Sequence, residues 1–135
     1  MKKLGLENHI ILCWRCTDRQ ELAYFYARAD LFLFPSLYDA SSIVQIEAAS
    51  QCTPWVFLKW AATAATITDN VNWFLSEQSA QAYADKIIEI VEDTDLYDEV
   101  SKNAKKDLYK NRESCVQEIY PLYLQWIQKK KNNFK

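Results

Sequence analysis

Glycine is nearly absent from this sequence. Gly5 is the only glycine among 135 residues, whereas average usage would place about nine or ten in a chain of this length. Close approaches between backbones and turns with a positive φ angle, which glycine permits at no steric cost, therefore have to be made with other residues. Tryptophan is frequent instead, with five residues.

Long apolar runs and a strong net charge are also missing. No run approaches the roughly 20 consecutive apolar residues that cross a bilayer, and Lys2 and Lys3 are not followed by the apolar stretch of a signal peptide. The formal net charge is −2, so no overall field draws the chain to nucleic acid or to an anionic membrane. These absences predict a soluble, cytoplasmic protein that binds no nucleic acid.

Histidine and paired metal ligands are scarce as well. His9 is the only histidine, so no Ser–His–Asp nucleophile set is available. Cys13 and Cys16 form a CxxC pair, but no second pair follows, and the pair stands at the end of a predicted strand rather than at a helix start. We therefore expect no metal site and no redox function, and reduced thiols are typical of cytosolic proteins.

The first half of the sequence alternates short apolar runs with amphipathic stretches. Apolar runs without polar alternation are typical of strands buried on both faces of a parallel sheet, and their alternation with helical stretches indicates βαβ units. The second half has helical periodicity, and Pro121 is expected to kink or split the last helix. We predict an α/β fold: a partial Rossmann-like domain with a small parallel sheet of about four strands, flanking helices and a helical C-terminal tail. The predicted strands are His9–Cys13, Leu31–Phe34, Pro54–Leu58 and the short Trp73–Leu75, and the predicted helices are Asp18–Ala29, Ser42–Gln51, Ser79–Val91, Leu96–Tyr109 and Glu113–Lys130.

A candidate anion site follows the second predicted strand. Ser42 and the glutamine three residues later have the spacing of a capping box, which makes Ser42 the expected N-cap. The backbone N–H groups of Ile43 and Val44 would then be free at the carboxyl edge of the sheet, where a helix N-terminus favours phosphate. Asp39 precedes this helix and Glu47 lies just over one turn into it. Both carboxylates can therefore flank the same anion and accept hydrogen bonds from the hydroxyls of a ribose or a sugar.

Several spaced motifs of this region resemble one glycosyltransferase family. Residues 35–39 read Pro-Ser-Leu-Tyr-Asp, seven residues intervene, and residues 47–49 read Glu-Ala-Ala, with Thr53 and Pro54 following. This pattern resembles the E-x7-E region of retaining GT-B glycosyltransferases of the group 1, or family 4, type. The preceding residues 26–36 match the stretch that leads into that motif, and residues 70–75 resemble the later N-G-x-L turn of the family.

The resemblance implies a role for each residue of the candidate site. In the family the second glutamate of the motif binds the nucleotide ribose, which here is Glu47, and the first contacts the transferred sugar, which here is Asp39. The implied activity is transfer of a hexose from a nucleoside diphosphate sugar, expected to be UDP-linked, to a glycan or lipid acceptor in cell-envelope polysaccharide or glycolipid synthesis, without a further cofactor. The backbone amides that hold the donor phosphates in the family are here those of Ser41, Ser42, Ile43 and Val44.

The loop before the predicted helix departs from the family pattern. Where the family has Glu-Gly-Phe-Gly, this sequence has Asp39, Ala40, Ser41 and Ser42. Aspartate shortens the first carboxylate by one methylene, and the loss of two glycines removes the close backbone approach that they permit. The contact with the sugar is therefore expected to differ from that in the family.

Trp14, Trp60 and Trp73 also stand where the family pattern has glycine. At Asn72 and Trp73 an Asn-Gly pair would supply a turn with positive φ, which a bulky residue enters only with strain. One hypothesis is a codon event, because GGA and UGA, or GGG and UGG, differ by one base. The alternative is that these residues are genuine aromatic side chains that pack in the core or stack on a nucleobase.

The resemblance further implies that residues 1–135 are a single, truncated C-terminal nucleotide-sugar-binding domain. The family has an earlier βαβ unit whose basic residues clamp the diphosphate, and an N-terminal domain that binds the acceptor. We therefore expect the chain by itself to be inactive and to need that N-terminal domain, from the same chain or from a separate subunit. The alternatives are a non-catalytic nucleotide-sugar-binding subunit and an inactive remnant. Lys129, Lys130, Lys131 and Lys135 suggest weak peripheral contact at the inner membrane face, where enzymes of this type meet lipid-linked acceptors.

Overall fold

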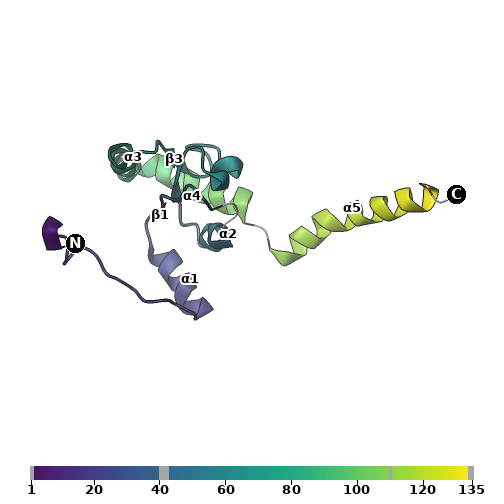
Figure 1. Ribbon diagram of the computed structural model, residues 1–135, viewed down its shortest axis with the longest axis horizontal. Helices are drawn as coiled ribbons and strands as arrows, with labels where there is room; N and C mark the ends of the chain where they lie inside the picture. The colour runs from purple at the N-terminus through teal and green to yellow at the C-terminus, as the bar shows by residue number, and fades with distance from the viewer. Residues whose placement is uncertain (1, 40–42, 110, 134–135) are drawn as a thin grey trace.

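The computed structural model describes residues 2–39, 43–109 and 111–133 of the chain. Figure 1 shows a small sheet surrounded by helices, with the N-terminal segment and the last helix leading away from it. The elements in chain order are η1 (Lys2–Leu4), α1 (Arg19–Arg28), β1 (Phe32–Phe34), α2 (Ile43–Ser50), β2 (Trp55–Leu58), η2 (Ala62–Thr66), β3 (Phe74–Ser76), α3 (Ala80–Glu92), α4 (Thr94–Leu108) and α5 (Arg112–Asn133).

Three parallel strands form the sheet, in the order β1, β2, β3. Phe32 pairs with Trp55, and Val56 pairs with Phe74. All four residues of the central strand β2 are buried, as its apolar sequence without polar alternation predicts. The α/β class and the parallel sheet expected from the sequence are confirmed.

The first predicted strand, His9–Cys13, is wrong. Residues 10–18 have no regular secondary structure, and Ile11 is 89% exposed and Leu12 72% exposed. A strand is stabilised by a neighbour that pairs with its backbone N–H and C=O groups, and no described strand pairs with this segment. The described sheet therefore has three strands rather than about four.

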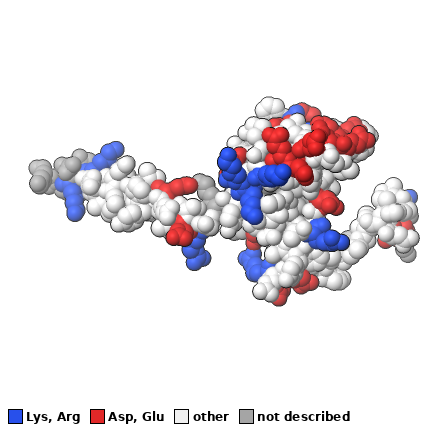
Figure 2. Space-filling model, turned by 180° about the vertical axis from the view of Figure 1, so that it is seen from behind, with Lys and Arg blue, Asp and Glu red and all other residues white. Residues whose placement is uncertain are grey.

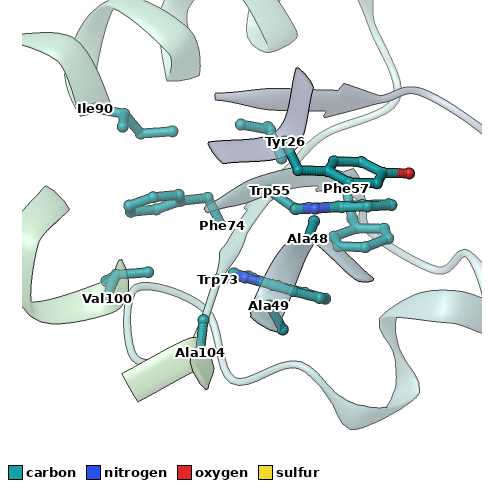
Figure 3. Close-up of a cluster of buried hydrophobic side chains, with 11 residues drawn as sticks. Tyr26, Ala48, Ala49, Trp55, Phe57, Trp73, Phe74, Ile90, Val100 and Ala104 are labelled. Carbon is teal, nitrogen blue, oxygen red and sulfur yellow. The ribbon is translucent and has the colours of Figure 1, made fainter. Parts of the chain in front are cut away.

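Stacked aromatic rings form the centre of the core (Figure 3). The centroid of the Trp55 ring lies 4.0 Å from that of Phe32 and 5.4 Å from that of Trp73. Trp55 and Trp73 are fully buried, and neither indole N–H has a hydrogen-bond partner among the described residues. Because such rings bury large apolar areas, the stack links β1, β2 and the residue before β3. Small side chains let the neighbouring helices approach the stack, since Ala48 and Ala49 of α2 are also fully buried.

The turn before β3 has its positive φ at Asn70 rather than at Trp73. Asn70 has φ 58°, and its backbone N–H donates to the Trp73 carbonyl at 2.9 Å. Asparagine tolerates the left-handed region better than most residues. The strain expected at Trp73 is therefore not found, and its buried indole favours the interpretation of Trp73 as a core residue.

Two other residues adopt the conformation that glycine favours. Trp60 follows β2 with φ 68° and is 86% exposed. Cys52 follows α2 with φ 62°. The Cys52 N–H donates to the Ala49 carbonyl and the Thr53 N–H donates to the Ala48 carbonyl, both at 3.1 Å. These are the two hydrogen bonds of a Schellman motif, in which glycine usually takes the position of Cys52.

Side-chain caps begin several of the helices, α1, α3 and α4 among them. Asp18 Oδ1 accepts a hydrogen bond from the Gln20 N–H at 2.7 Å at the start of α1. Ser79 Oγ accepts one from the Ala82 N–H at 3.1 Å at the start of α3, and Asp93 caps α4 in the same way. Each cap of this kind stabilises a helix by about 1 kcal/mol, so local sequence sets where these helices begin.

Helix α5 leads away from the sheet (Figure 1). It runs through Pro121 without interruption, so of the kink or split expected at this proline the split does not occur. Large apolar side chains along α5 are exposed, among them Leu122 and Trp126. None of the helices in the described ranges combines the length and the apolar character needed to span a membrane.

Candidate functional site

A cavity of about 410 Å³ lies where the segment before α1 meets the start of α2. Cavities that bind small ligands usually have volumes of about 300–1,000 Å³. The residues that line it are Arg15, Cys16, Thr17, Arg19, Leu22, Ile43, Val44 and Glu47.

Helix α2 brings three of the predicted site residues to this cavity. Ile43 is the first residue of α2, and Glu47 follows it by four residues, so both lie on the same face of the helix. Val44 lies beside them and also lines the cavity. Ser41 and Ser42, including the predicted cap, lie outside the described residues.

A side chain from α1 pairs with the carboxylate of Glu47. The Arg19 Nη1 group donates a hydrogen bond to Glu47 Oε1 in an ion pair. The Arg19 side chain is 78% exposed, whereas that of Glu47 is only 24% exposed. Burial raises the pKa of Tyr26, and the negative charge of Glu47 raises it further, while Arg19 lowers it. Glu47 is thus paired with a cation on its solvent side.

Asp39 is half-buried and is not among the residues that line this cavity. The structure therefore places Glu47, Ile43 and Val44 together and leaves the first predicted carboxylate outside their cavity. The glutamine of the predicted capping box, Gln45, donates its side-chain amide to the Thr63 carbonyl at 3.1 Å. This hydrogen bond holds α2 against η2.

Arg15 and Arg19 are cavity residues that the sequence analysis did not identify. The family resemblance placed the basic contacts of the diphosphate in an earlier unit, yet these two guanidinium groups line the same cavity as Glu47. Guanidinium groups bind phosphates with strong, charge-assisted hydrogen bonds. Their position just after an apolar run and at a helix start was a usable signal, but 28 residues separate Arg19 from Glu47, and only packing brings them together.

Charge is unevenly distributed over the surface (Figure 2). Acidic side chains gather over α3 and the start of α4, and basic ones lie beside them. Within α4, Asp95 stands in the first turn and Lys105 and Lys106 stand in the last, which suits the helix dipole. The cavity, by contrast, has two arginines and one glutamate in its lining, so it favours an anion.

The CxxC pair lies just before the N-cap of α1. Cys13 and Cys16 are free thiols, and Cys16 Sγ donates to the Asp18 carbonyl at 3.3 Å and to Glu21 at 3.5 Å. Desolvation raises the pKa of Cys16, and the carboxylate of Glu21 raises it further, which lowers the fraction of reactive thiolate. In the part of the chain that the structure describes, no three His, Cys, Asp or Glu residues are grouped so that they could hold a metal ion.

Solved structures with the same fold are found among glycosyltransferases. The C-terminal domain of the glycosyl transferase group 1 family protein LpcC from Francisella tularensis has a TM-score of 0.69 and 25% identity, over 78% of this chain and 54% of that chain. HepE from Anabaena, solved in complex with UDP-glucose, has a TM-score of 0.68 and 27% identity, over 78% of this chain and 28% of that chain. Sucrose-phosphate synthase from Thermosynechococcus elongatus has a TM-score of 0.79 and 24% identity, over 94% of this chain and 32% of that chain, and shows the fold alone.

These matches cover only part of each relative. The chain spans little more than half of the LpcC structure and about a third of the other two. No curated protein sequence matches the chain. The sequence model of the family described as glycosyl transferases group 1 matches residues 1–107. This match extends over most of the 135 residues, and the chain belongs to the glycosyl transferases group 1 family.

Proposed function

We propose that this chain is the donor-binding domain of a glycosyltransferase, and that the cavity between α1 and α2 binds a nucleoside diphosphate sugar. The observation that carries the proposal is the meeting of Glu47, the start of α2 and two arginines in one cavity, in a chain of the group 1 family. HepE, a relative of the same fold, was solved with UDP-glucose, which supports a UDP-linked donor.

Each part of the cavity suits one part of the donor. The first turn of α2 brings the positive end of a helix dipole to the diphosphate, and Arg15 adds positive charge beside it. Glu47 accepts hydrogen bonds from the ribose hydroxyls. Negative charge grows on the diphosphate as the sugar leaves, so the same groups stabilise the transition state more than the bound donor.

The complete enzyme would transfer a hexose to a glycan or lipid acceptor at the cytoplasmic face of the inner membrane. Asp39 would contact the transferred sugar, and the backbone amides of Ser41 and Ser42 would join those of α2 at the phosphates. An N-terminal domain, in the same chain or in a separate subunit, would bind the acceptor. Without it, this chain would bind the donor but transfer nothing.

Calorimetric titration of the chain with UDP and UDP-glucose tests the proposal. Glu47→Gln should weaken the binding of both ligands about tenfold, since an amide keeps the size but loses the charge and half of the acceptor capacity. The matched control is Glu77→Gln, because Glu77 also makes an exposed ion pair, with Lys59 at 2.7 Å, but does not line the cavity. Absence of binding by the wild-type chain, or equal affinities of the wild-type chain and Glu47→Gln, would refute the proposal.

Exposed apolar surface favours a second candidate function, that of a nucleotide-sugar-binding subunit that needs a partner domain. Ile11 and Leu12 are exposed before α1, and Leu122 and Trp126 are exposed on α5. Apolar patches of this kind usually mark an interface. In this case the isolated chain should self-associate in light scattering, and Leu122→Glu with Trp126→Glu should make it monomeric without changing its affinity for UDP. A wild-type chain that is monomeric at high concentration would contradict this candidate.

A further inference from the structure

We propose that Arg19 is a positioning residue for Glu47: its ion pair fixes the direction of the carboxylate so that one oxygen remains available for the ribose of the donor. The inference rests on the proposed function, because it gives Arg19 of α1 a role in the cavity that would bind the donor. In this role Arg19 acts through Glu47 and does not bind the diphosphate itself, although the two arginines that line the cavity first suggest such direct binding.

The ion pair leaves part of the carboxylate free. Arg19 Nη1 contacts Glu47 Oε1, and an ionised carboxylate has about four acceptor positions on its two oxygens. Glu47 Oε2 can therefore accept hydroxyl groups while Oε1 stays paired. Because only 24% of the Glu47 side chain is exposed, water cannot orient it freely, and a neighbouring cation has a large influence on its direction.

A positioning role and a direct role at the phosphates predict different effects of Arg19→Ala. If Arg19 acts through Glu47, the loss of affinity should be the same for uridine and for UDP, since both carry the ribose. It should also disappear in the Glu47→Gln background, because residues that act as one unit are non-additive. If Arg19 contacts the diphosphate, UDP should lose affinity while uridine does not, and the loss should persist in that background.

The experiment is a double-mutant cycle on the 135-residue chain, with UDP and uridine as probes and ligand-observed NMR or calorimetry as the readout. Arg19→Ala should weaken both ligands about tenfold, in the range of couplings between contacting residues. Arg19→Lys should recover part of the loss. Lys59→Ala is the matched control, because it removes the cation of an exposed ion pair outside the cavity, and should change neither affinity. Circular dichroism of each variant checks the fold.

The outcomes separate this inference from the proposed function. A loss confined to UDP, additivity of Arg19→Ala with Glu47→Gln, or unchanged affinity of Arg19→Ala would overturn the positioning role while the cavity remained a nucleotide site. A wild-type chain that binds neither UDP nor uridine would overturn both.

Discussion

Replacement of Trp60 by glycine should stabilise this protein, although it removes a large aromatic side chain. Trp60 has φ 68°, in the left-handed region that costs an L-residue about 1–2 kcal/mol. Its side chain is 86% exposed, so little burial is lost with the indole. Glycine has more conformational entropy in the unfolded chain than tryptophan, and this offsets about 0.5–1 kcal/mol of the strain energy that the substitution removes. The balance is a gain of up to about 1.5 kcal/mol in the free energy of unfolding.

Urea denaturation followed by circular dichroism measures this change, and thermal denaturation should show a rise in Tm of about 3 °C for 1 kcal/mol in a chain of this size. Trp60→Ala is the sharpest control, because it also removes the indole but keeps the Cβ atom that the left-handed conformation disfavours. Trp14→Gly is the second control, since Trp14 is also exposed, at 95%, but has no positive φ. Equal stabilities of Trp60→Gly and Trp60→Ala would refute the reasoning.

Three further predictions concern the ends of the elements and the core. Cys52→Gly should raise the free energy of unfolding by about 1 kcal/mol, because Cys52 follows α2 with φ 62°; a Cys52→Ala control that is equally stable would contradict this. Trp73→Ala should lower it by about 3–5 kcal/mol in urea denaturation, because the variant loses a fully buried ring that stacks on Trp55; a loss below about 1 kcal/mol would show that the ring does not contribute to the core. Burial raises the pKa of Tyr83 from 10.0 to about 12, so its contribution to stability is complete below pH 10 and is lost as the pH rises towards 12. Tyr83→Phe should therefore flatten the decline in stability over that interval, and an unchanged pH profile of the variant would count against this cause.

The structure also separates the tryptophans that stand at glycine positions of the family. Trp60 has a backbone conformation that suits glycine, whereas Trp73 fills the core with its whole ring. The codon hypothesis therefore has support from the backbone at position 60 and none at position 73. Gene sequence with UGG and no UGA at these positions, in a code that reads UGG as tryptophan, would refute the version of the codon event in which UGA is recoded.

Local sequence determined most of the secondary structure. The apolar run Leu31–Phe34 became β1, the run Pro54–Leu58 became β2, and the helices of the second half began at or near the expected residues. These elements follow from periodicity and from caps such as Ser79, which act within a few residues. The sequence also predicted that Glu47 lies on the helix after β1. The pattern that resembles the E-x7-E motif of the glycosyltransferase family has its second carboxylate at this residue.

Tertiary structure decided which predicted strands pair with a neighbour and which side chains contact one another. His9–Cys13 has the apolar pattern of a strand, but a strand also needs a paired neighbour, and the described sheet offers none to this segment. Trp73 was expected to be strained in a turn, yet the stack with Trp55 draws its ring into the core, and Asn70 takes the positive φ. The ion pair between Arg19 and Glu47 joins residues 28 positions apart, which no local pattern can reveal, since it depends on how α1 packs against α2.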